Sequence, residues 1–84
     1  MNKVLERKIK LIWDFKGPAA AKTAAHYDIH LQEYIANEEL KYDITGHLDI
    51  SDMHSITYMV VAEFEMIQAR DDLKPHRGEV YEDE

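Results

Sequence analysis

The chain has 84 residues, a net charge of −7 and no cysteine. Its length corresponds to one small domain over residues 1–84, and the lack of cysteine excludes disulfide bonds and thiolate zinc sites. The acidic charge argues against nucleic acid as a partner, because nucleic-acid binding relies on Lys and Arg residues that neutralise phosphates.

Charged residues interrupt every apolar run at the N-terminus, which reads MNKVLERKIKLIW. The sequence therefore contains neither a signal-peptide core nor a stretch of about 20 apolar residues that would span a membrane. We expect a soluble, cytoplasmic protein without a membrane partner. A chain this short buries only about 60% of its unfolded surface, so self-association is a further expectation.

The first half of the chain predicts a strand followed by the main helix. Residues 8–15 alternate between apolar and polar, with Ile9, Leu11, Trp13 and Phe15 on one face, which is typical of a half-buried strand. Residues 18–40 begin with a proline that suits a helix start and continue with apolar residues at helical spacing. The expected core stripe of this helix is Ala20, Ala24, Tyr27, Leu31, Tyr34 and Ile35.

The second half predicts a hairpin of two strands, 41–51 and 56–63. Residues 64–73 favour a short helix, although an extended third strand is the alternative. The acidic tail from about residue 79 begins with a short edge strand at 79–81. The order β-α-β-β-α with a final short β matches an α+β, ferredoxin-like fold, with an antiparallel sheet and helices on one face.

The uncovered face of such a sheet is the expected ligand or interface face. If the helices cover the apolar side of each strand, this face contains Ile12, Asp14, Thr45, His47, Asp49, Met59, Val61 and Glu63. Its predicted centre, Ile12, Met59 and Val61, is apolar, and contiguous exposed apolar surface usually marks an interaction site. A homodimer through this face is the main expectation, and a solvated sheet or a ligand pocket in the face are the alternatives.

Histidines on the main helix suggest a metal site. His26, His30 and Glu33 follow at i, i+4 and i+7, so they lie on one flank of the helix. Two histidines one turn apart and a carboxylate are ligand types that a divalent transition metal such as zinc, nickel or copper accepts. A pair of half-exposed surface histidines is the alternative reading.

A second group of polar residues lies on the predicted hairpin, with His47 and Asp49 on the uncovered face, away from the main helix, and Asp52 and His54 in the turn. For this group the alternative reading is turn formation, which Asp52 and Ser55 favour by bonding to nearby backbone. The sequence contains no nucleophile elbow and no glycine-rich phosphate loop, so catalytic residues are unknown.

The segment HLQEYIANEELKYDITGHLD, followed by a strand, a short helix and Leu73-Lys74-Pro75, resembles the YCII-related family of dimeric α/β barrel domains. The resemblance implies a ferredoxin-like fold and a dimer through the open sheet face. In that family a helix histidine and an aspartate before a proline are regarded as a catalytic pair. His30 matches the histidine, but Lys74 occupies the position of the aspartate.

Two functions follow as expectations. The first is a non-enzymatic homodimeric or protein-interaction module. The second is a metal- or small-ligand-binding protein, or a minor enzyme, that uses histidines of the first helix or of the open sheet face.

Overall fold

The computed structural model describes residues 7–82 and confirms the predicted α+β order. The elements are β1 (Lys8–Lys16), α1 (Ala20–Glu38), β2 (Ile44–Ser51), β3 (His54–Ala62), α2 (Met66–Leu73) and β4 (Arg77–Tyr81). One 3-10 turn, Glu63–Glu65, leads into α2, so the segment after β3 is helical as predicted and not an extended strand. The predicted edge strand at 79–81 is part of β4.

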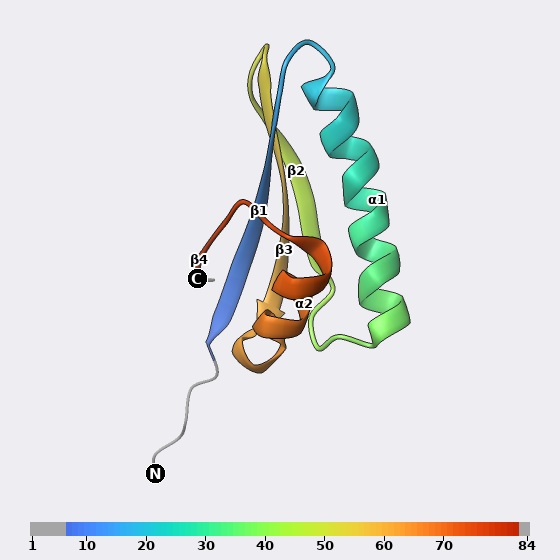
Figure 1. The fold of residues 1–84 in the computed structure, drawn as a ribbon, viewed down its shortest axis with the longest axis vertical. Helices are drawn as coiled ribbons and strands as arrows, with labels where there is room; N and C mark the ends of the chain where they lie inside the picture. Colours follow the sequence, from blue (N-terminus) through green and yellow to red (C-terminus); the bar gives the residue numbers. More distant parts are fainter. Residues whose placement is uncertain (1–6, 83–84) are drawn as a thin grey trace.

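The four strands form one antiparallel sheet in the order β2-β3-β1-β4. Because β3 lies between β1 and β2, the β1-α1-β2 unit is split, which is compatible with the ferredoxin-like arrangement. Figure 1 shows α1 running along one side of the sheet. The second helix packs on the same side, since its Ala69 belongs to the same core as Leu31 of α1. The other side of the sheet carries no helix among residues 7–82.

Backbone geometry at the helix ends explains their positions. Gly17, with φ of +107°, turns the chain from β1 towards α1. At the other end of α1, Glu39 adopts a left-handed conformation, and the N–H of Leu40 bonds to Ile35 O over 3.1 Å, which closes a Schellman motif. No helix in the described part of the chain is long and apolar enough to cross a membrane.

The core lies between the two helices and one face of the sheet. It contains Ile9, Leu11, Trp13, Leu31, Ile35, Met59, Val61 and Ala69. Trp13 packs against Tyr27 of α1 with ring centroids 5.3 Å apart, and its Nε1 donates to Leu73 O at the end of α2 over 3.0 Å. These two contacts fix both helices to β1. The predicted core stripe of α1 is confirmed, with Tyr27 and Tyr34 partly buried at its edge.

The prediction of which hairpin face lies under α1 is wrong. Directly paired residues of antiparallel strands share a face, and the register pairs Leu11 with Met59, so Met59 lies on the covered face. Thr45 of β2 pairs with Met59, which places the polar side of β2 under the helix. Four of the residues predicted for the core line the open face instead: Ile44, Leu48, Tyr58 and Val60. The fifth, Ile50, lies at a register shift of β2 and is 52% exposed.

The sequence of β3 explains this error. Val60 and Val61 are adjacent, so they point to opposite faces, and both are fully buried. A strand that is apolar on both faces does not reveal which face meets a helix. In β2, apolar and polar residues alternate clearly. The polar side of β2, with Thr45 and His47, is nevertheless the covered side, because α1 offers it a polar partner.

Candidate functional site

The polar partner is Asp28, which lies in the buried stripe of α1 and faces β2. Asp28 Oδ2 lies 2.9 Å from His47 Nδ1, and Gln32 Nε2 donates to Asp28 Oδ1 over 3.2 Å. The Asp28 side chain is 9% exposed, whereas that of His47 is 43% exposed. A buried carboxylate thus orients an imidazole whose other nitrogen, Nε2, remains on the accessible side.

The hydrogen bonds keep Asp28 ionised despite its burial. Burial by itself raises the pKa of a carboxyl group, but hydrogen bonds from Thr45, His47 and Gln32 outweigh burial and lower the pKa of Asp28 below its usual value. Because a carboxylate only accepts hydrogen bonds, the Nδ1 of His47 carries the proton. The free Nε2 is then able to accept a proton or to attack an electrophile, which is the arrangement of a histidine in an Asp–His dyad.

Small residues in the first half of α1 allow polar contacts between the helix and the sheet. Ala20 and Ala24 are buried, which brings the helix backbone close to the sheet. As a result, the Thr57 hydroxyl of β3 donates to Ala24 O over 2.7 Å. Next to it, the Ser55 hydroxyl donates to Asp49 Oδ1 over 2.8 Å. The contact between α1 and the hairpin is therefore held partly by hydrogen bonds and partly by apolar packing.

A second cluster of charged residues is centred on Asp14, on the open face. Arg77 of β4 donates to both carboxylate oxygens of Asp14, over 2.9 Å and 3.0 Å. His54 Nε2 lies 2.9 Å from Asp14 Oδ1. The hydrogen bonds from the Arg77 guanidinium have the largest effect on the pKa of Asp14 and lower it. Burial raises this pKa to a smaller extent, and His54 lowers it further. The pKa of Asp14 therefore lies well below its usual range. The cluster is compact and its charges are mutually compensated.

His76 has a structural role next to this cluster. Its backbone N–H donates to Ile12 O over 2.9 Å, just before β4 begins. Its ring Nδ1 accepts from the backbone N–H of Asp14 over 2.8 Å. The imidazole thus accepts the hydrogen bond of the Asp14 backbone N–H, which lies beyond the last residue of β1 that pairs with β4.

The predicted metal ligands lie near one another, but their donor atoms do not converge. His26 Nε2 and His30 Nε2 are 3.1 Å apart, whereas Glu33 Oε1 approaches the other nitrogen of His30, Nδ1, at 3.5 Å. All three residues are exposed. In the part of the chain that the structure describes, no group of three or more His, Asp or Glu side chains is arranged to hold a metal ion.

The predicted ligand or interface face is divided between the two sides of the sheet. Ile12 and Asp14 lie on the open face as predicted. His47, Met59 and Val61 lie on the covered face, so their predicted place on the open face is wrong. The reason is again the apolar character of both faces of β3. The prediction that His47 stays away from the main helix is wrong for the same reason.

The open face instead presents Ile44 and Leu48 of β2, and two further exposed apolar residues, Ile50 and Met53, follow them at the hairpin end. We call this set the β2 patch: Ile44, Leu48, Ile50 and Met53. Leu48, Ile50 and Met53 are 55%, 52% and 51% exposed. Beside the patch, the Tyr58 ring lies across Gly46, where an added Cβ would overlap the ring and its hydroxyl. Lys10 Nζ sits 4.6 Å from the centroid of that ring.

Sequence reasoning missed Asp28 and Arg77 as site residues. For Asp28 a signal existed, because it follows Ala24 by one helical turn and therefore falls on the buried stripe. A carboxylate in a buried stripe needs a partner, and His47 and Thr45 are the polar residues on the strand beside it. Arg77 gave no such signal, since its pairing with Asp14 depends on the position of β4 beside β1.

Comparisons with known proteins add no relative. No family model matches the chain, and neither the curated proteins nor the solved structures contain a match.

Proposed function

We propose that the protein is a non-enzymatic module that forms a homodimer through the open face of its sheet, centred on the β2 patch. The observation that carries this proposal is the exposure of Leu48 on a sheet face that no described helix covers, with exposed Ile50 and Met53 at the adjoining hairpin end. Contiguous exposed apolar side chains are typical of interaction surfaces. The resemblance to the YCII-related family implies the same face.

Charge pairing on the open face supports its burial against a second copy. The carboxylate of Asp14 on this face already binds Arg77 and His54. Lys10 contacts the Tyr58 ring. Burial of a paired charge costs far less than burial of an isolated one. The face is therefore suited to dehydration by an apolar partner surface such as its own copy.

The dimensions of the face also fit a small dimer interface. The four strands have nine, eight, nine and five residues. At about 4.8 Å between strands and about 3.3 Å per residue, they give a planar area of about 500 Å². Side-chain relief increases the accessible area beyond this value. Specific interfaces of the smaller class bury about 600 Å² on each partner. A face-to-face dimer thus falls in the size class of the smaller specific interfaces.

Sedimentation equilibrium at micromolar concentration tests the proposal. Wild type should sediment with twice the 9.9 kDa monomer mass. Leu48→Glu should give a monomer, because the introduced charge would be buried without a partner. Ile29→Glu is the matched control, since Ile29 is exposed to a similar extent, 53%, but lies on α1. This variant should remain dimeric.

A further variant separates face packing from edge pairing of two β2 strands. Lys10→Glu lies on β1, two strands away from the free edge of β2. It should weaken a face-to-face dimer and leave an edge-paired dimer unchanged. A wild-type protein that stays monomeric at high micromolar concentration, or a Leu48→Glu variant that stays dimeric, contradicts the proposal. Added salt should strengthen the dimer, because each copy carries a net charge of −7.

A second candidate function, small-ligand binding with weak acid–base chemistry, is favoured by the Asp28–His47 pair. A buried, ionised carboxylate that orients a half-exposed imidazole is a frequent element of catalytic sites. Hydrolysis of p-nitrophenyl acetate reports on accessible nucleophilic imidazole. We expect His47→Gln to lower this rate and His26→Gln to retain it. Equal rates for wild type and His47→Gln would exclude His47 as the reactive group.

A further inference from the structure

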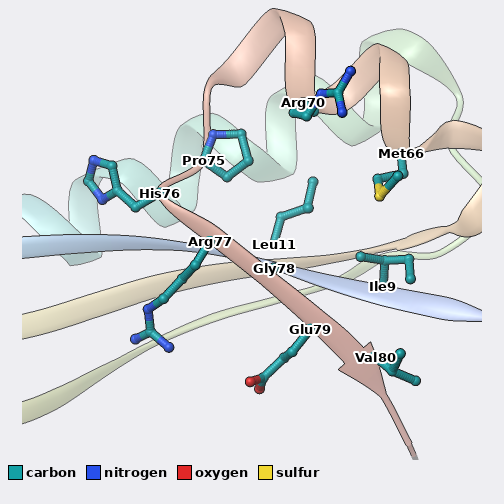
Figure 2. A pocket seen from close by; sticks show the side chains of 10 residues that line it. All are labelled: Ile9, Leu11, Met66, Arg70, Pro75, His76, Arg77, Gly78, Glu79 and Val80. Carbon is teal, nitrogen blue, oxygen red and sulfur yellow. The ribbon is translucent and has the colours of Figure 1, made fainter.

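A pocket with a volume of 450 Å³ lies between α2 and β4, on the helix side of the sheet. Small-molecule sites in proteins span about 300 to 1,000 Å³, so the pocket has the size of a ligand site. Figure 2 shows Ile9 and Leu11 rising from β1 into this space and Met66 reaching in from α2. The floor of the pocket is therefore apolar.

Gly78 of β4 leaves this space open. It pairs with Leu11, so a side chain at this position would point towards α2. An added Cβ would make only ordinary contacts, 3.5 Å from Leu11 Cδ2 and 3.6 Å from Lys10 O. Close packing therefore does not require glycine at this position. The missing side chain creates room that a larger residue would fill.

Apolar surface at the pocket remains exposed to water. Val80, which lines it from β4, is 47% exposed. A small ligand that covered the pocket would remove part of this apolar surface from water, which is favourable.

Arg70 of α2 provides the charge at the pocket. Its side chain is 57% exposed, and its ion pair with Asp71 is long, with Nε and Oδ1 3.5 Å apart. The other charged lining residues, Arg77 and Glu79, point to the opposite side of β4 in Figure 2. Arg77 is moreover committed to Asp14. Arg70 is thus the lining cation available to an anionic group of a ligand.

We propose that this pocket binds a small amphipathic carboxylate. Its apolar body would lie on Ile9, Leu11 and Met66, and its carboxylate would pair with the Arg70 guanidinium, whose planar donors match a carboxylate. This site lies on the side of the sheet opposite to the proposed dimer face. The binding of such a ligand is therefore independent of self-association.

Titration of ¹⁵N-labelled protein with octanoate, followed by NMR, tests the inference. Saturable shifts should appear at the backbone amides of Leu11, Gly78 and Val80. Gly78→Val should abolish them, because its side chain would occupy the space over Ile9 and Leu11, and its Cβ would make only ordinary contacts there. Arg70→Gln should weaken octanoate binding about tenfold, as expected for loss of one charge-assisted contact, and leave the binding of 1-octanol unchanged.

Lys22→Gln is the matched control, since it removes one exposed positive charge from α1, which does not line the pocket. It should bind octanoate as wild type does. Amide spectra of each variant verify that the fold is intact. The inference is overturned if no saturable shift occurs at millimolar octanoate, if the shifts fall on the β2 patch, if Gly78→Val still binds, or if Arg70→Gln binds octanoate as wild type does.

Discussion

Asp28 Oδ2 and His47 Nδ1 lie 2.9 Å apart, which fixes the position of the proton on the His47 ring. The carboxylate accepts, so neutral His47 carries its proton on Nδ1. His54 shows the opposite arrangement, because its Nε2 lies 2.9 Å from Asp14. Long-range ¹H–¹⁵N spectra at alkaline pH should show a protonated Nδ1 in His47 and a protonated Nε2 in His54.

The variant Asp28→Ala is the control for this tautomer prediction. It should release His47 to the Nε2-protonated form that free imidazole side chains prefer and leave the His54 signals unchanged. A His47 ring that is protonated on Nε2 in wild type would show that the pair with Asp28 does not persist in solution.

Replacement of Asp28 by Asn should destabilise the fold. Asn keeps the shape of the side chain but places an amide donor against groups that donate to Asp28, namely His47, Thr45 and Gln32. The expected loss in the free energy of unfolding is about 1 to 3 kcal/mol, as for buried hydrogen bonds to a charged group. Urea unfolding measures it. Asp52→Asn, at an exposed turn position, should change stability by no more than about 0.5 kcal/mol.

Asp14 should make stability depend on acid pH. Its folded-state pKa is lowered, first by Arg77, so the unfolded carboxyl with a pKa of about 3.9 binds a proton more readily. The stabilisation by Asp14 is therefore complete at neutral pH and is lost as the pH falls below about 4 towards the folded-state pKa. The difference in Tm between wild type and Asp14→Asn should be largest at pH 7 and should shrink below pH 4.

Glu79→Gln is the reference for the acid-pH prediction, since Glu79 is exposed on the same strand as Arg77. The Tm of Asp14→Asn is therefore compared with that of Glu79→Gln at each pH. A constant difference between wild type and Asp14→Asn from pH 7 to about pH 2 would show that the contact with Arg77 is too weak to lower the pKa.

The order of the elements follows from local sequence patterns. The alternation of β1, the helical period of α1 and the turn residues between strands are determined by neighbours in the chain. The side of the hairpin that faces α1 is not local. It depends on how β3 pairs with β1, and the apolar residues on both faces of β3 permit either choice.

The same non-local choice limited the prediction of the site. His47 was recognised as a residue of interest, but its partner Asp28 follows only once the polar side of β2 faces the helix. The triad of Asp14, His54 and Arg77 joins three strands. Residues that meet across strands far apart in sequence leave no periodic pattern, so spacing arguments cannot bring them together.

Gly46 and Tyr58 provide a test of the open face itself. The two residues are paired across β2 and β3, and a Cβ at Gly46 would overlap the Tyr58 ring. Gly46→Ala should therefore displace the ring, break its contact with Lys10 and cost about 1 to 3 kcal/mol, as overpacking does.

The sign of this effect should reverse when Tyr58 is absent. In a Tyr58→Ala background no ring opposes the added methyl group, and alanine in a strand is about 0.5 to 1 kcal/mol more favourable than glycine. Gly46→Ala should then stabilise the protein slightly. A double-mutant cycle by urea unfolding measures this coupling. Equal destabilisation in both backgrounds would mean that the Tyr58 ring does not lie over Gly46 in solution. The backbone at Gly46, beside the β2 patch, would then be uncovered.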